Sequence, residues 1–279
     1  MLRITGLDVE ARVGRDRVRL LDQVDLAVGR GRCTAVIGES GSGKSTLLKS
    51  ILRTGGRRVS VSGSIVLAGR EIGSLGVKEV TRVRGKQVAL VAQNALAALD
   101  PFYAVGDQIA YLARRHGGLS KADARVKALD LLREVALADP ERNMHALPHE
   151  LSGGMRQRCV LAMALACEPR LLLADEPTTA LDVITQARAL ALLASIQRSH
   201  GMSMVFVTHD IGVAATVADD VVVLHRGKVV ESGPVATVLL SPSHPYTQGL
   251  VAANRPPAPG ERWRTVAQPV APEPPPNNR

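Results

Sequence analysis

One eight-residue segment, Gly38–Ser45, constrains this chain more than any other part of the sequence. It reads Gly-Glu-Ser-Gly-Ser-Gly-Lys-Ser and fills every fixed position of the phosphate-loop pattern G-x-x-x-x-G-K-[ST]. The apolar, β-branched run Cys33–Ile37 precedes it, and Thr46–Leu52 has the composition of a helix start. Glycines let successive N–H groups turn toward one phosphate, and a helix N-terminus adds partial positive charge. The segment therefore predicts a phosphate cradle in an α/β core.

Within the cradle, we expect Lys44 to reach the β- and γ-phosphates of a nucleotide and the Ser45 hydroxyl to ligate Mg²⁺. An incidental glycine-rich turn is the alternative, but such a string arises by chance in only roughly 1% of chains this long. The nucleotide contacts are predicted at Gly38, Glu39, Ser40, Gly41, Ser42, Gly43, Lys44, Ser45 and Thr46.

Composition limits the classes of function that remain open to this chain. The chain has 279 residues and a formal net charge of +9, yet aromatic residues make up only 2% and do not alternate with the basic ones. That pattern argues against a base-stacking platform for nucleic acid. Three cysteines without ligand spacing predict buried thiols in a reducing compartment. No N-terminal signal segment is visible, and the apolar stretch Cys159–Cys167 is too short to span a bilayer, so any contact with a membrane is expected through partners.

Strand and helix patterns alternate along the chain, which predicts an α/β fold with a P-loop NTPase core and a mostly parallel sheet. We expect an N-terminal antiparallel β subdomain and an inserted α-helical subdomain at about residues 96–166, within a nucleotide-binding domain of residues 1–253. Residues 254–279 carry eight prolines and predict a disordered tail. Besides Cys33–Ile37, the predicted strands are Leu2–Glu10, Leu20–Val28, Ser60–Leu67, Gln87–Ala92, Arg170–Ala174, Met204–Thr208, Val221–Leu224 and Lys228–Ser232.

Two carboxylates end one of these strands. Asp175 and Glu176 follow the apolar run Leu171–Ala174, where Asp175 would lie near Mg²⁺ at Ser45. Glu176 would then polarise a water in line with the γ-phosphate. A strand capped by solvated acids is the alternative for an isolated pair.

A second phosphate-seeking element begins a later helix. Ser152, Gly153 and Gly154 place a hydroxyl and two glycines before the apolar run Cys159–Ala166. Because the chain already has a phosphate loop, this element suggests a composite site shared by two chains, although a serine-capped helix after a glycine turn is the alternative. Gln93 and His209 also follow predicted strands, and the carboxyl ends of parallel strands are where such sheets place ligands.

In this order, these motifs resemble the nucleotide-binding domain of ATP-binding cassette (ABC) transporters over roughly residues 1–250. The Leu151–Gly154 element is highly specific to that superfamily. A closer resemblance is to the importer ATPases for oligopeptides, dipeptides and nickel. It rests on Ala98–Pro101, Gly106–Ile109, Gly154–Pro169, Asp175–Val183 and the C-terminal motif Ser243–Leu250.

The resemblance implies an ATPase that binds ATP and Mg²⁺ and drives uptake of small peptides or of nickel or another chelated metal. Glu176 would activate the attacking water, His209 would contact the γ-phosphate, and Gln93 would sense Mg²⁺. Asp182 would line a dimer interface, and Ser152–Gly154 would bind the nucleotide of the opposite subunit. The implied partners are two permease subunits, a second ATPase subunit and an extracytoplasmic substrate-binding protein, at the cytoplasmic face of the cell membrane, with no nucleic acid.

Three positions depart from the family pattern. The adenine-stacking aromatic is absent from Ala11–Leu20, where Arg12, Val13 or Arg17 would have to replace it. Asn94-Ala95 stands in place of Asp-Pro, and the cysteine-free tail favours the shorter nickel or metal-chelate members.

Two other functions remain as alternatives. A soluble ATPase of this superfamily acting on nucleic acid or ribosomes would generally carry two cassettes or a long heptad insert, and neither is visible. A non-hydrolysing regulatory cassette is disfavoured by Glu176 and His209.

Overall fold

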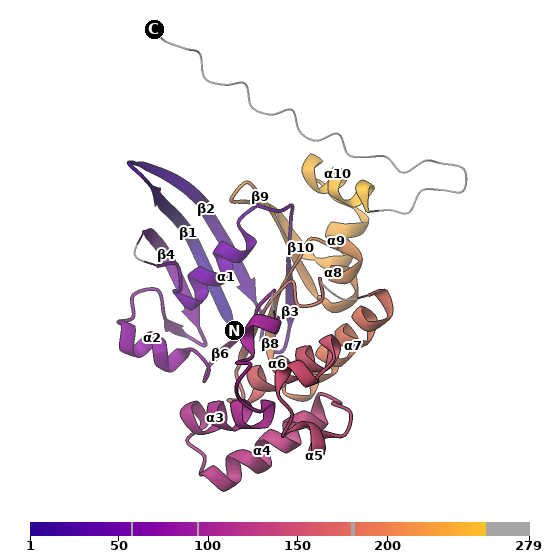
Figure 1. Ribbon diagram of the computed structural model, residues 1–279. Helices are drawn as coiled ribbons and strands as arrows, with labels where there is room; N and C mark the ends of the chain where they lie inside the picture. Colours follow the sequence, from indigo (N-terminus) through magenta and orange to yellow (C-terminus); the bar gives the residue numbers. More distant parts are fainter. Residues whose placement is uncertain (57, 94, 180–181, 255–279) are drawn as a thin grey trace, which may run out of the picture.

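Ten strands form two sheets in the computed structural model, which describes residues 1–56, 58–93, 95–179 and 182–254 (Figure 1). The first sheet is antiparallel and four-stranded, in the order β2-β1-β4-β5. Its strands are β1 (Leu2–Val13), β2 (Asp16–Val28), β4 (Val59–Leu67) and β5 (Arg70–Glu71).

The second sheet has six strands in the order β10-β9-β3-β8-β7-β6, and only the β9–β10 pair is antiparallel. The predicted fold class, with its mostly parallel core sheet and antiparallel N-terminal sheet, is confirmed. Its strands are β3 (Cys33–Ile37), β6 (Val88–Val91), β7 (Leu171–Asp175), β8 (Ser203–Thr208), β9 (Asp220–His225) and β10 (Lys228–Pro234).

The first two strands are longer than their sequence pattern indicated. They were expected to end at Glu10 and begin at Leu20, but the pairing continues to Val13 and Asp16 around a two-residue turn at Gly14-Arg15. Gly14 takes the left-handed conformation that such a turn needs, with φ 64°. The outer part of this hairpin is held together by backbone pairing and has no buried apolar face. Its arginines therefore do not give the alternating apolar pattern from which a strand is predicted.

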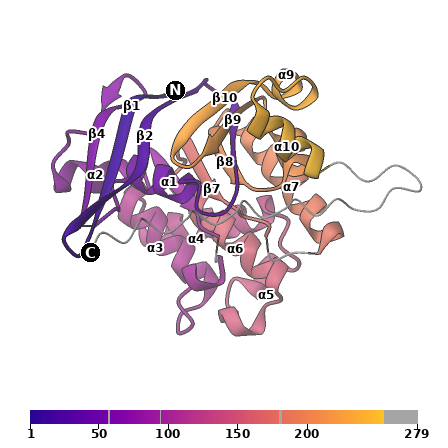
Figure 2. The same cartoon turned by 90° about the horizontal axis from the view of Figure 1, so that it is seen from above.

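Ten α-helices in the described residues cover these sheets. Figures 1 and 2 show α3–α6 gathered together at one end of the core sheet, while α9 and α10 lie beside β9 and β10. The helices are α1 (Lys44–Leu52), α2 (Val77–Val83), α3 (Val105–Gly117), α4 (Lys121–Glu134), α5 (Pro140–Asn143), α6 (Gly153–Leu165), α7 (Val183–Ser199), α8 (Ile211–Val217), α9 (Val235–Leu240) and α10 (Pro245–Ala253). Two 3₁₀ turns, Ala95–Ala98 and Pro148–Glu150, complete the segment between β6 and α6.

Both faces of the core sheet are buried. One face packs against α3, α4 and α6, and the other against α1 and the N-terminal sheet. A third apolar cluster joins β3 and β9 to α8, α9 and α10. All five residues of β3 are buried, which explains why this strand is a continuous apolar run rather than an alternating one.

No helix among the described residues has the length and apolar composition needed to cross a bilayer. The proline-rich tail from residue 255 onward lies outside the described residues.

Candidate nucleotide site

The carboxyl ends of four neighbouring strands bring the predicted site residues to one edge of the core sheet. Strands β6, β7, β8 and β3 run parallel, so the segments that follow them leave the sheet on the same side. Gln93 follows β6, Glu176 follows β7, His209 follows β8, and the phosphate loop follows β3. The sheet order thus assembles residues that are far apart in the sequence.

Two glycines of the loop are required by close packing. A Cβ on Gly38 would lie 2.1 Å from the carbonyl oxygen of Leu224, and one on Gly43 would lie 2.6 Å from Cδ2 of Leu21. Gly43 is also the N-cap of α1 with φ 110°, and as a glycine it has no side chain to cap the first turn of this helix. The N–H groups of that turn therefore lack a capping side chain from the N-cap and can donate to an anion held by the loop.

The Ser42 hydroxyl also indicates an anion site in the phosphate loop. It is buried and has no hydrogen-bond partner among the described residues. Buried hydroxyls without a partner are rare, since desolvation then goes uncompensated. A phosphate oxygen in the cradle would satisfy this group.

Lys44 lies inside the cradle with only 6% of its surface exposed. Its Nζ donates hydrogen bonds to the carbonyl oxygens of Gly38 (2.7 Å) and Glu39 (2.8 Å). Burial lowers the pKa of this amine, and the nearby charges of Glu176 and Asp175 oppose that shift. Two backbone carbonyl oxygens of the loop therefore hold its own lysine in place.

Ser45 and Asp175 bring together the oxygen ligands that Mg²⁺ prefers. The Ser45 hydroxyl donates to Oδ1 of Asp175 at 3.2 Å, which joins the start of α1 to the end of β7. Burial raises the pKa of Asp175, and the hydrogen bond from Ser45 partly offsets the shift. A bound divalent cation would reverse that cost, so a hydroxyl and a half-buried carboxylate at this position fit the metal.

Glu176 is the centre of the polar contacts at this edge. His209 Nδ1 lies 3.1 Å from Oε1, while Gln93 Nε2 and Thr179 Oγ1 donate to Oε2 at 3.1 and 3.0 Å. Glu176 also has a left-handed backbone, with φ 45°, and its N–H donates to Val207 on β8. Its position is thus fixed by both backbone and side chain, at a cost in strain that is common in functional sites.

Ser152, Gly153 and Gly154 are not part of this cluster. Ser152 is the N-cap of α6 and accepts a hydrogen bond from the Met155 N–H at 3.3 Å. Ser152 and Gly153 are exposed, and no hydrogen bond among the described residues links the three to the phosphate loop. Asp182, likewise exposed, caps α7 by accepting from the Thr185 N–H at 3.0 Å. Within one chain, these residues stabilise helix starts.

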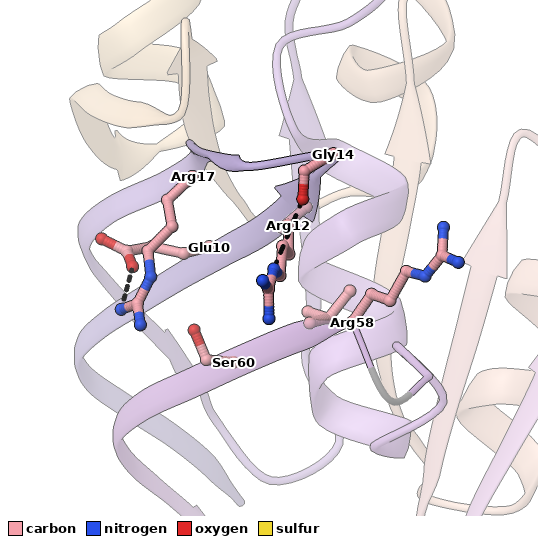
Figure 3. A pocket seen from close by; sticks show the side chains of 8 residues that line it. Glu10, Arg12, Gly14, Arg17, Arg58 and Ser60 are labelled. Atoms are coloured by element: carbon pink, nitrogen blue, oxygen red, sulfur yellow. Dashed lines mark hydrogen bonds and ion pairs between the residues drawn. The ribbon is translucent and has the colours of Figure 1, made fainter.

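A cavity of about 520 Å³ lies at the outer end of the β1–β2 hairpin (Figure 3). Arg12 and Arg17, two of the three residues expected to replace the adenine-stacking aromatic, line it. Arg12 Nε donates to the Gly14 carbonyl oxygen at 3.4 Å, and Arg17 lies 3.7 Å from Glu10. Arg58 joins them from the segment that enters β4, whereas Val13 lies outside the lining. The cavity contains guanidinium groups and no aromatic ring among the residues that line it.

Sequence reasoning missed two residues that support the site. Thr179 donates to Glu176 from three residues further along the chain, and a Thr at this spacing from an acid is a recognisable signal for such a contact. The Gly227 N–H donates to the Ser42 carbonyl oxygen at 2.9 Å and supports the loop from the β9–β10 turn. Nothing local in the sequence indicates that second contact.

The ABC transporter family profile matches residues 21–179 of the chain. A putative peptide import ATP-binding protein of Brucella melitensis is 44% identical over 258 residues, which cover 90% of this chain and 76% of that protein. The chain belongs to the ABC transporter family. The oligopeptide transport ATP-binding protein OppD of Bacillus subtilis is 40% identical, over 91% of this chain and 71% of its own length.

Solved structures place the fold among the ATPase cassettes of the ABC family. A dimeric structure of the cassette MJ0796, in a post-hydrolysis state bound to ADP and Pi, has a TM-score of 0.75 and 28% identity. The match covers 84% of this chain and 99% of that one. The fold and the relatives together support an importer ATPase rather than an ABC ATPase acting on nucleic acid or ribosomes.

Proposed function

We propose that this ABC ATPase binds Mg²⁺ and ATP at the loop Gly38–Ser45 and hydrolyses ATP at Glu176 to drive peptide import. The observation that supports this most directly is the pairing of Ser45 with Asp175, next to a Glu176 held by three polar side chains. One edge of the sheet thereby carries a phosphate cradle, a metal-binding pair and a positioned carboxylate. These are the groups that phosphoryl transfer to water needs.

The cradle would bind the phosphates through the N–H groups of the first turn of α1, the Ser42 hydroxyl and Lys44. Thr46 lies in the same turn, and the exposed loop residues Glu39, Ser40 and Gly41 would complete the contact with the nucleotide. Ser45 and Asp175 would hold Mg²⁺, which neutralises charge on the phosphate oxygens, and Gln93 would sense it.

Glu176 would accept a proton from the attacking water. Burial by itself raises the pKa of a carboxylate, but the hydrogen bonds from His209 and Thr179 reverse this and lower the pKa of Glu176. The group is therefore ionised at neutral pH, as a proton acceptor must be. His209 and Gln93 would orient the carboxylate and contact the γ-phosphate and the metal.

A second copy of the cassette, identical or related, would complete each site. Ser152, Gly153 and Gly154 begin helix α6 and have no hydrogen bond to the phosphate loop among the described residues, so they would be free to meet the γ-phosphate held by a partner. Asp182 would lie at the same interface. The cassette resembling this chain with a TM-score of 0.75 is itself dimeric, which supports the arrangement.

An exposed aromatic group offers a surface for the permeases. Phe102, Tyr103 and Tyr111 are 84%, 61% and 60% exposed. The chain has only six Phe, Tyr and Trp residues, so half of them lie on this surface, which we call the aromatic patch. Tyr103 and Tyr111 line a cavity of about 640 Å³ between α3 and α4. A patch of this kind at the surface is typical of a protein interface.

The relatives reported above are named for peptides, and we therefore propose a peptide rather than nickel or a metal chelate as cargo. An extracytoplasmic binding protein would deliver it, and the cassette would dock at the cytoplasmic face of the membrane. The arginine cavity would receive the adenine base, since guanidinium planes stack on aromatic rings.

Nucleotide affinity and hydrolysis test the core of this proposal. Titration calorimetry of the purified chain with ATP should give binding that Lys44→Ala weakens strongly, because the change deletes a charge-assisted contact to the phosphates. The matched control is Lys127→Ala, which removes a surface ion pair with Glu168 on the helical side of the molecule. Unchanged affinity in the Lys44 variant would show that the loop is not the phosphate cradle.

A further inference from the structure

Two hydrogen bonds connect the phosphate loop to the C-terminal part of the chain. The Gly227 N–H donates to the Ser42 carbonyl oxygen, and the Glu39 N–H donates to the hydroxyl of Tyr246 at 3.1 Å. The second contact joins residues 207 positions apart. Both partners lie beyond the segment 21–179 that the family profile matches. Two hydrogen bonds of the loop therefore come from residues outside the segment that the family profile matches.

The contact with Tyr246 acts on the peptide group that holds Lys44. The Glu39 N–H and the Gly38 carbonyl belong to one planar peptide unit, so fixing one end fixes the direction of the other. The Gly38 oxygen accepts from Lys44 Nζ at 2.7 Å, and the Glu39 oxygen accepts from the same atom at 2.8 Å. One rigid peptide unit thus separates the Tyr246 hydroxyl from the ammonium group that would meet the phosphates.

Tyr246 is itself held firmly. Glu231 on β10 accepts hydrogen bonds from the Ser243 N–H (2.8 Å), the Ser243 hydroxyl (2.9 Å) and the His244 N–H (3.1 Å). Nδ1 of His244 in turn accepts from the Tyr246 N–H at 3.1 Å, which caps α10. The Tyr246 ring packs against His225 at the end of β9, with ring centroids 3.9 Å apart.

These contacts give the motif Ser243–Tyr246 a physical explanation. Glu231 binds Ser243 and the backbone N–H of His244, a set of contacts that we call the Glu231 clamp. His244 in turn caps α10, and the hydroxyl of Tyr246 in the first turn of that helix reaches the phosphate loop. Burial also raises the pKa of Tyr246, so its hydroxyl stays protonated and neutral at physiological pH.

We propose that Tyr246 is a positioning residue for the nucleotide site, whose hydroxyl orients the Gly38–Glu39 peptide and links helix α10 to nucleotide binding. This inference rests on the proposed nucleotide site. Coupling between two contacts is reciprocal. If the bond between Tyr246 and Glu39 strengthens ATP binding, then bound ATP must strengthen the bond between Tyr246 and Glu39 by the same free energy. Helix α10 should therefore report whether the site is occupied.

The first test compares ATP affinity in the wild-type chain, Tyr246→Phe and Asn254→Ala. Tyr246→Phe deletes the hydroxyl and keeps the ring, so Kd for ATP should rise roughly 3- to 10-fold, as expected for one hydrogen bond. The rate at saturating ATP should stay within about twofold, because Glu176 and its partners are untouched. Asn254→Ala is the matched control, since it removes a 2.9 Å hydrogen bond to Leu250 at the other end of the same helix.

The outcomes separate the two proposals. Failure of the wild-type chain to bind ATP would overturn both of them. Binding by the wild type with an equal Kd in Tyr246→Phe would leave the nucleotide site standing and overturn the role of Tyr246. An affinity loss as large in Asn254→Ala would also overturn it, because it would show a general loosening of α10.

Hydrogen exchange tests the link in the other direction. ATP should slow amide exchange in residues 247–253 of the wild-type chain. In Tyr246→Phe it should have no such effect, even when the concentration of ATP is high enough to saturate both proteins. A Glu231→Gln variant, which weakens the clamp without touching the ring, should show an intermediate effect. Equal protection of α10 by ATP in wild type and Tyr246→Phe would contradict the proposed link.

Discussion

Nδ1 of His209 lies 3.1 Å from Oε1 of Glu176, which joins the ends of two adjacent parallel strands, β8 and β7. His209 has a side chain 57% exposed, whereas that of Glu176 is only 14% exposed. The histidine therefore stands between the carboxylate and solvent. The two side chains therefore form one hydrogen-bonded unit across the ends of β7 and β8.

Replacing Glu176 should separate hydrolysis from binding. Glu176→Gln keeps the size of the side chain but removes the proton-accepting carboxylate, so ATP turnover should fall at least ~10²-fold. Affinity for ATP should change little, because no phosphate donor is lost. Phosphate release and calorimetry measure the two effects. Glu141→Gln, which breaks only an exposed ion pair with Arg133, is the control; near-normal turnover in Glu176→Gln would refute the assignment.

A mixed dimer can test whether each site is shared between two subunits. Lys44→Ala in one subunit and Gly154→Asp in the other put both changes at one composite site and leave the second intact. Such a dimer should keep up to about half of the wild-type turnover if the sites act independently. Position 154 can carry a Cβ without a clash in its own chain, since that atom would meet only Cγ2 of Thr185 at 3.7 Å.

The matched control carries both changes in one subunit opposite a wild-type partner. It contains the same substitutions but places one of them at each site, so it should be as inactive as the two variant homodimers. Equal activity in the two mixed dimers would contradict a shared site.

The aromatic patch should matter for coupling and not for hydrolysis by the isolated subunit. Phe102→Ser with Tyr103→Ser removes apolar surface that is already exposed, so folding and basal turnover should be retained. Co-purification with the permeases, and the stimulation of ATPase activity that they give, should drop by an order of magnitude or more. Val77→Ser, at another exposed apolar position, is the control. Normal permease binding by the double variant would remove the patch from the interface.

The clamp at Glu231 should make stability depend on pH in a defined window. Burial would raise the pKa of this carboxylate, but the hydrogen bonds from Ser243 and His244 lower the pKa from its ordinary value of 4.5 to about 2. A depressed carboxylate pKa stabilises the fold above the unfolded value and loses that contribution as pH falls. The difference in unfolding free energy between wild type and Glu231→Gln should therefore be constant above about pH 5 and shrink between pH 4.5 and 2.

Urea unfolding at several pH values measures this difference. Asp130→Asn is the control, since it removes a carboxylate whose ion pair with Arg133 is exposed. A difference between wild type and Glu231→Gln that does not change with pH would show that the clamp does not depend on the ionised carboxylate.

The sequence was most informative where the chemistry lies within a few residues of a strand end. The loop at Gly38–Ser45 and the acids at Asp175 and Glu176 were predicted because each motif contains its own strand and turn signals. Eight consecutive residues specify the loop, and the six residues Leu171–Glu176 specify the strand and its two acids.

Contacts that depend on the arrangement of the whole chain were not predicted. The bond from Glu39 to Tyr246 exists only because β9 lies beside β3 and β10 beside β9, and no local pattern encodes that order. The hairpin at Val13–Asp16 was missed for a different reason, since arginines occupy a strand that has no buried side to mark it.

The position of β3 between β8 and β9 has a consequence for the newly synthesised chain. All five residues of β3 are apolar or buried, yet their neighbours in the sheet are Met204–Thr208 and Asp220–Val223. At a synthesis rate of about 5–20 residues per second, β3 leaves the ribosome roughly 10–30 s before its partners. During that time, the edges of this strand have no hydrogen-bonding neighbour, while the intervening helices α3–α6 already have local contacts. The emerging chain therefore keeps the edges of its phosphate-loop strand unpaired until β8 and β9, about three-quarters of the way along the chain, have been made.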